Sequence, residues 1–281
     1  MRRRRRPTLA LALLLAGACG VSEDQEVAIG RQNAEQINAR LPIVRDAVVA
    51  EYVQQLGLSI AKTTSRADLD WHFVVVDSRE VNAFALPGGI IYVNRGLIER
   101  AHKLDELAGA LGHEIGHVVR RHSVTQMKKA QGANVAVGLA CTLTRICDNN
   151  VAQAAIQVGG AALFARYSRQ DEAEADSEAV ENVIRAGIDP EGIPALFERL
   201  IEERRASPLA IEAFFASHPL EEDRIRATEQ LIAALDPARL SGLARDIPSY
   251  LAFTARLNAL PPAPEPSGPL LPPEQLRRGA R

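Results

Sequence analysis

Residues 113–117 read His113-Glu114-Ile115-Gly116-His117, an H-E-x-x-H sequence. On a helix, residues four positions apart lie on one face, so the two imidazoles can reach a single metal ion. At roughly 100° per residue, the apolar residues around the motif form one stripe on the side opposite the histidines. This stripe comprises Leu104, Leu107, Leu111, Ile115 and Val118. The sequence therefore predicts a helix that docks on a core through one face and presents two metal ligands on the other.

A five-residue motif also occurs by chance in unrelated helices, where the two histidines would be solvated. Three glycines in the same segment argue against that alternative, namely Gly109, Gly112 and Gly116. Each glycine costs about 1 kcal/mol in a helix interior, so a helix that contains three has a spatial reason for them. We expect these glycines to permit close approach of a neighbouring helix or to leave room for a substrate.

A catalytic zinc ion needs a third protein ligand and an open position. A third histidine in the pattern H-E-x-x-H-x-x-G-x-x-H is excluded, because Arg120 and Ser123 stand where that pattern has Gly and His. The remaining histidines have no fixed spacing to the motif: His72, His102, His122 and His218. On a later helix, Glu172 and Asp176 share one face, which suits a ligand and a carboxylate that orients a ligand imidazole. We expect one zinc ion per chain with Glu172 as its third ligand, and Glu174 facing solvent. A wholly solvated acidic face is the alternative.

The rest of the chain is predicted to be mostly helical with a small sheet, an α+β fold. We expect helices over 23–65, 104–122 and 168–186, strands over 71–77 and 90–93, and two or three further helices to about residue 259. Pro87, Gly88 and Gly89 form a turn signal before the second strand.

The N-terminus reads as an export signal, with Arg2–Arg6 followed by a short apolar run, Leu9–Ala16. Small residues precede Cys19, which resembles a bacterial lipobox, so residues 1–18 are predicted to be removed and Cys19 to be lipidated. The alternative is an ordinary signal peptide with an incidental cysteine. Gly20 follows Cys19 in place of an aspartate associated with inner-membrane retention, which favours the outer membrane.

Net charge is −2 with a pI near 6.3, so no basic excess indicates nucleic acid as a partner. Cys141 and Cys147 form an even pair in an exported protein, which predicts a disulfide, with two buried free thiols as the alternative. They lie in an expected helical hairpin over 133–167, whose apolar halves are too short to span a bilayer and can form a lid. The last segment, 260–281, holds seven of the 16 prolines and is expected to be disordered.

Four blocks together resemble the family of zinc peptidases that includes HtpX, the mitochondrial Oma protease, the CaaX prenyl proteases and the β-barrel assembly-enhancing protease. The blocks are residues 82–97 around Pro87-Gly88-Gly89, the H-E-x-x-H helix, Glu172–Asp176 as E-x-x-A-D, and Ser217-His218-Pro219 with Arg224. The resemblance covers roughly residues 23–235. Unlike the multi-spanning relatives, this chain is expected to carry no membrane helix, and it resembles small, exported, lipid-anchored members most.

The resemblance implies a zincin-like gluzincin fold over 19–259, with the small mixed sheet beside the zinc helix. Glu114 would act as general base, and His218 or Arg224 would stabilise the oxyanion. The alternatives to these catalytic roles are that His218 only marks the start of a helix and that Arg224 only forms a surface ion pair. The strand around Pro87, Gly88 and Gly89 would pair with an extended polypeptide substrate.

The function expected from these features is a zinc metalloendopeptidase on the periplasmic side of a bacterial cell envelope, acting on misfolded or unassembled envelope proteins. One alternative is an assembly chaperone whose peptidase site is usually self-inhibited. Another is a structural lipoprotein with a stabilising zinc ion, although such a site would have a fourth protein ligand and no use for Glu114.

Overall fold

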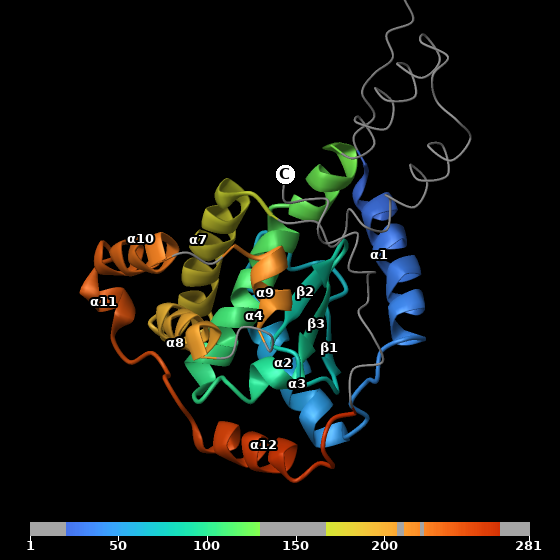
Figure 1. Cartoon of the computed structure of the whole chain (residues 1–281). Helices are drawn as coiled ribbons and strands as arrows, with labels where there is room; N and C mark the ends of the chain where they lie inside the picture. Colours follow the sequence, from blue (N-terminus) through green and yellow to red (C-terminus); the bar gives the residue numbers. More distant parts are fainter. Residues whose placement is uncertain (1–20, 130–166, 207–210, 220–221, 265–281) are drawn as a thin grey trace, which may run out of the picture.

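A computed structural model describes residues 21–129, 167–206, 211–219 and 222–264 of the 281-residue chain (Figure 1). The elements are α1 (Glu23–Asn38), α2 (Ala47–Ala61), β1 (His72–Val76), β2 (Ala83–Leu86), β3 (Ile90–Asn94), α3 (Arg95–Ile98), α4 (Leu104–Val119), α7 (Arg169–Arg185), α8 (Gly192–Ala206), α9 (Glu212–Ser217), α10 (Glu222–Ala233), α11 (Pro237–Leu240) and α12 (Pro248–Asn258). The expected fold class, mostly helical with a small mixed sheet beside the zinc helix, is confirmed.

The sheet has the order β1-β3-β2, with β1 parallel and β2 antiparallel to β3. The β2–β3 hairpin turns at Gly88 and Gly89, which have φ of 82° and 98°. Only glycine adopts such left-handed angles without steric cost, which explains the pair of glycines at this turn. Because β3 is the central strand, β2 forms one edge of the sheet among the described strands.

Alternation along the strands divides the core into two layers. Phe84, Leu86, Ile90 and Tyr92 face one side, where they pack with Ala34 of α1. The opposite faces of the same strands belong to the larger core that contains α2 and α4. Figure 1 shows the sheet between α1 on one side and α4 on the other, with α7 beyond α4. The H-E-x-x-H helix thus lies at the centre of the molecule.

The glycines of α4 mark its contacts with neighbouring helices, as the sequence predicted. A Cβ atom at Gly116 would lie 2.7 Å from the backbone oxygen of Ala175 in α7. A Cβ atom at Gly109 would lie 2.8 Å from Ile193 of α8. The apolar stripe on the other face is buried. Close backbone contact with α7 brings the acidic helix next to the two histidines.

Two of the expected helices are divided in the structure. The segment 23–65 forms α1 and α2, because Pro42 has no amide hydrogen to donate and disfavours a helical residue before it. The intervening Ile43 instead forms an isolated bridge with Val76 at the β1 edge. The predicted helix 104–122 ends at Val119, and Arg121 adopts a φ of 57° before residues 122–129 become helical again.

In the C-terminal half, α7 agrees with its predicted boundaries. Helix α7 starts after the N-cap Ser168 and ends where Gly187 takes a φ of 79°. Among the described residues, five helices follow instead of the two or three predicted, and α9 and α11 are short. Arg95 donates a hydrogen bond to the Pro261 carbonyl at 2.7 Å, so residues just past 259 contact the folded body.

Other sequence predictions fall outside the part of the chain that the structure describes. These are the signal segment with Cys19, the hairpin up to residue 166 with Cys141 and Cys147, and the tail after residue 264. No helix among the described residues has the length and apolar character needed to cross a membrane.

Candidate metal centre

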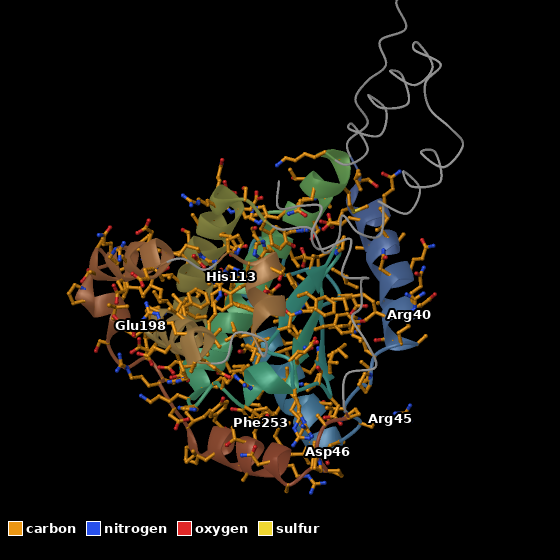
Figure 2. The ribbon with its side chains drawn as sticks, viewed as in Figure 1. Arg40, Arg45, Asp46, His113, Glu198 and Phe253 are labelled. Atoms are coloured by element: carbon orange, nitrogen blue, oxygen red, sulfur yellow. The ribbon has the colours of Figure 1, made fainter. Side chains whose placement is uncertain are left out.

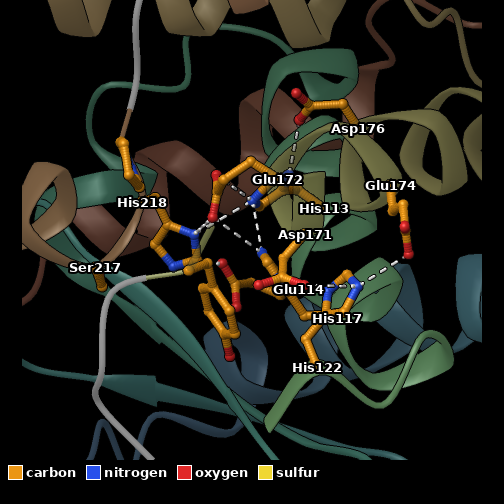
Figure 3. Close-up of polar contacts among 12 residues, drawn as sticks. His113, Glu114, His117, His122, Asp171, Glu172, Glu174, Asp176, Ser217 and His218 are labelled. Carbon is orange, nitrogen blue, oxygen red and sulfur yellow. Dashed lines mark hydrogen bonds and ion pairs between the residues drawn. The ribbon is translucent and has the colours of Figure 1, made fainter. Parts of the chain in front are cut away.

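Three separate elements bring four buried side chains together. Helix α4 supplies His113 and His117, α7 supplies Glu172, and His218 follows the end of α9 (Figure 3). One ligand atom from each of the four lies within 4.8 Å of the others. The two histidine Nε2 atoms are 3.0 Å apart, and Glu172 Oε2 is 3.5 Å from His113 Nε2. Figure 2 shows that His113 lies in the interior, whereas the exposed Arg40 and Glu198 lie at the periphery.

The first histidine of the motif contacts a carboxylate, that of Asp176. Asp176 Oδ1 lies 2.9 Å from His113 Nδ1, on the ring side opposite the cluster. Arg224 in turn donates from Nε and Nη2 to both Asp176 oxygens at 2.8 Å, and from Nη1 to Glu172. Arg224 also donates to the Pro219 carbonyl at 3.1 Å. The guanidinium is thus engaged with both carboxylates. This geometry does not support the oxyanion role that the sequence indicated.

Glu114 lies on the same helix, directly against the cluster. Its Oε1 atom is 3.4 Å from His218 Nε2, and its side chain is 1% exposed. Among the described residues, Glu114 Oε2 and His218 Nε2 have no hydrogen-bond partner. Burial raises the pKa of Glu114 above its ordinary value, which brings this carboxylate closer to the range in which a general base operates. Two buried polar atoms without partners indicate that the site is built for a further group.

The electrostatics of the cluster suit a cation. Although burial acts to raise the pKa of Glu172, the neighbouring His218 and His113 hold that pKa well below its usual range. Burial and the nearby charges of His113 and His218 lower the pKa of His117, so this imidazole is neutral, as a metal ligand must be. Burial lowers the pKa of His113, but hydrogen bonds to Asp176 and Glu172 outweigh it and raise the pKa to about 9. A bound metal ion would displace that proton.

The second histidine has neighbours that the sequence analysis did not assign. The Nδ1 atom of His117 is 2.9 Å from His122 Nδ1, and the ring of Tyr167 stacks on His117 at 3.8 Å between centroids. Tyr167 shares a hydrogen bond with Ser123 at 3.1 Å. His122 Nε2 contacts Glu174 Oε2 at 3.3 Å, so Glu174, whose side chain is 37% exposed, also reaches the site from the solvent side. Helical spacing does not predict that His122 contacts His117, because the turn at Arg121 brings the two rings together.

The turn Pro87-Gly88-Gly89, in contrast, is not an open surface. All three residues are buried. A Cβ atom at Gly88 would lie 2.7 Å from the Cα atom of Val27 in α1, and the Gly88 amide donates to Glu26 at 3.2 Å. Packing beneath α1 therefore accounts for the burial of Pro87 and Gly88, and Trp71 packs against Gly89.

Comparison with known proteins agrees with this geometry. The family model described as peptidase family M48 matches residues 47–232, which include all four clustered side chains. The chain belongs to peptidase family M48. Enzymes of family M48 use zinc, and two imidazoles with a carboxylate are a donor set that zinc accepts in catalytic sites.

Several known proteins are about 30% identical to this chain over the region that aligns. A putative β-barrel assembly-enhancing protease of Vibrio cholerae is 29% identical over 78% of this chain and 46% of its own length. The mitochondrial metalloendopeptidase OMA1 of Schizosaccharomyces pombe is 30% identical over 64% of this chain and 52% of its own. The metalloprotease LoiP of Escherichia coli is 30% identical over 58% of this chain and 63% of its own length. The chain thus spans about half the length of the first two relatives.

Proposed function

We propose that this chain is a zinc-dependent metalloendopeptidase in which His113, His117 and Glu172 hold the metal. The observation that carries the proposal is the convergence of these three buried side chains next to Glu114, whose Oε2 atom has no partner among the described residues. A site that only stabilises the fold has no need of an unpaired buried carboxylate.

The chain's own residues account for proton transfer during hydrolysis. A zinc ion held at this site supplies a Lewis acid that polarises the scissile carbonyl and makes water a better nucleophile at neutral pH. Glu114 takes a proton from the attacking water and delivers it to the leaving amide nitrogen. Asp176 and Arg224 keep His113 and Glu172 in place. His218 Nε2, which points towards Glu114, can donate to the oxyanion once a substrate is bound beside Glu114.

In the described arrangement, however, His218 belongs to the metal cluster. Its Nδ1 atom is 3.1 Å from Glu172 Oε1 and 3.3 Å from His113 Nε2. A fourth protein donor would take the position that water needs, so this arrangement favours a resting state that is inactive. That observation supports a second candidate function, an assembly chaperone whose peptidase site is usually self-inhibited.

The outer edge of β2 is the place that we propose for the substrate backbone. The Asn94 amide donates to the Asn82 carbonyl at 2.9 Å. In an antiparallel pair every second residue is hydrogen-bonded to the partner strand, so Phe84 and Leu86 also bond to β3. The intervening residues, Ala83 and Ala85, therefore direct their amide and carbonyl groups away from β3. Both residues are buried, at 1% and 3% exposed, so a substrate can pair with these groups only when this edge becomes uncovered. An extended polypeptide that pairs there gains affinity from main-chain hydrogen bonds with little sequence preference.

Low sequence preference and an export signal together support misfolded or unassembled envelope proteins as substrates. The relative from Vibrio cholerae carries a name that refers to β-barrel assembly, which points in the same direction. We further propose that Cys19 carries a lipid that anchors the mature protein on the periplasmic side of the outer membrane, and that Cys141 and Cys147 form a disulfide.

Zinc content of ligand variants tests the proposed site. Wild type is expected to hold one zinc ion per chain, and His113→Ala and Glu172→Ala to lose it. Glu181→Ala is the matched control, because Glu181 lies on the same helix and pairs with Arg239 at the surface. If Glu172→Ala retains zinc with wild-type affinity, the third ligand is assigned wrongly.

A further inference from the structure

The two histidines of the H-E-x-x-H motif are supported in different ways. His113 contacts a carboxylate directly through Nδ1, at 2.9 Å from Asp176. His117 contacts another imidazole, with 2.9 Å between its Nδ1 and that of His122. The partner of a metal-binding histidine usually accepts a proton from the ring nitrogen that does not bind the metal. His122 occupies that position for His117.

His122 reaches His117 because the polypeptide turns sharply between them. On a continuous helix, residues five apart would lie about 140° apart around the axis and would not face each other. The φ of 57° at Arg121 breaks the helix. Arg121 is secured in this conformation by an ion pair with Glu26 at 2.7 Å and by a hydrogen bond to the Val21 carbonyl at 2.7 Å. A non-glycine residue at positive φ carries a conformational cost, which these contacts offset.

The orientation of the two rings requires one assignment of the protons once His117 binds the metal through Nε2. The Nε2 atoms of His113 and His117 face each other at 3.0 Å, on the side of the cluster. When His117 binds the metal through Nε2, its Nδ1 must carry a hydrogen and donate it. His122 Nδ1 then accepts, and its proton lies on Nε2, facing Glu174 Oε2 at 3.3 Å and Asp171 Oδ1 at 3.8 Å. Gln170 donates to the other Glu174 oxygen at 2.9 Å and holds that carboxylate in place.

We propose that His122 is the positioning residue of the ligand His117, and that Glu174 fixes the tautomer of His122. The carboxylate thus acts on the zinc site through two imidazoles, from an α7 side chain that is 37% exposed. The proposal rests on His117 being a zinc ligand. It explains why a histidine that is 3% exposed lies beside the motif with both ring nitrogens in contact with polar atoms.

Zinc affinity, measured by competition with a chromophoric chelator, tests the proposal without recourse to catalysis. The informative variants are His122→Leu, which has no acceptor, and His122→Asn, whose carbonyl oxygen can take the place of Nδ1. Glu174→Ala removes the outer carboxylate, and the surface variant Glu181→Ala is the control. His122→Leu is expected to bind zinc about 10–100-fold more weakly than wild type, with His122→Asn recovering most of that loss. Glu174→Ala should fall between wild type and His122→Leu.

A second readout distinguishes positioning from packing. In the zinc-loaded wild type, the proton on His117 Nδ1 should give a protected downfield imidazole resonance, retained in His122→Asn and lost in His122→Leu. Equal zinc affinity for wild type and His122→Leu would overturn the proposal, as would equal losses in the Asn and Leu variants. His117→Ala is measured in parallel. If His117→Ala keeps wild-type zinc affinity, His117 is not a zinc ligand and the ligand assignment has failed. If His117→Ala loses zinc but His122→Leu keeps wild-type zinc affinity, only the role of His122 is refuted.

Discussion

Gly116→Ala offers a quantitative test of how closely α4 and α7 are packed. The added Cβ atom would lie 2.7 Å from the Ala175 carbonyl oxygen and 3.0 Å from its Cα atom. Both are backbone atoms, so the strain cannot be relieved by rotation of a side chain, and α7 must move. Overpacking of this kind costs about 1–3 kcal/mol. Replacing a helical glycine by alanine contributes about 1 kcal/mol in the opposite direction. We therefore expect a net loss of about 0–2 kcal/mol, with the variant no more stable than wild type.

Gly112→Ala is the matched control for this substitution. Its nearest contact would be the Val183 Cγ1 atom at 3.1 Å, a side-chain atom that can shift. Helix propensity should then roughly offset the strain. Urea denaturation of both variants gives the free energies of unfolding. Because α7 also carries Glu172, zinc affinity should fall in Gly116→Ala and remain unchanged in Gly112→Ala. A Gly116→Ala protein that is about 1 kcal/mol more stable than wild type, as propensity alone requires, would refute the reasoning.

Three other expectations concern charge and processing. Arg224→Gln leaves the carboxylates of Glu172 and Asp176 buried without their cation, so the metal-free protein should lose about 3–5 kcal/mol in urea denaturation with chelator present. Burial raises the pKa of Asp105 from 3.8 to about 6, so the folded protein binds a proton at this group more tightly than the unfolded chain. The free energy of unfolding should therefore increase as pH falls from 7 towards 4. Asp105→Asn should remove that part of the pH dependence, and an unchanged slope would speak against it. Cys19 should carry a diacylglyceryl group in mass spectra of membrane-extracted protein; a soluble mature form cleaved elsewhere would exclude the anchor.

The sequence was sufficient for the centre of the fold because local rules and tertiary packing agree there. The spacing of His113 and His117, the apolar stripe behind them and the glycines on a third side all follow from one helical period. The ends of α7 were also predictable, since Ser168 caps its start and Gly187 takes the left-handed conformation after its end. In this region, each residue preference points to the same structure.

The remaining parts depend on contacts between distant segments, which spacing does not encode. Pro87 and its two glycines read as a turn in sequence, but α1 covers Pro87 and Gly88, and Trp71 covers Gly89. Glu174 lies away from Glu172 on a helical wheel, yet His122 meets it because the polypeptide turns at Arg121. A non-glycine residue at positive φ has no dependable sequence signal, and here ion pairing with a distant helix stabilises it.

The most direct measurement of the proposed function compares wild type and Glu114→Gln in two assays on the same preparations, zinc content and cleavage of an unstructured polypeptide such as casein. Glutamine preserves the shape of the side chain and leaves His113, His117 and Glu172 untouched. We predict one zinc ion per chain in both proteins and hydrolysis by wild type that falls by at least about 100-fold in the variant. Zinc-loaded Glu114→Gln that cleaves the substrate at the wild-type rate would contradict the role of Glu114 as general base.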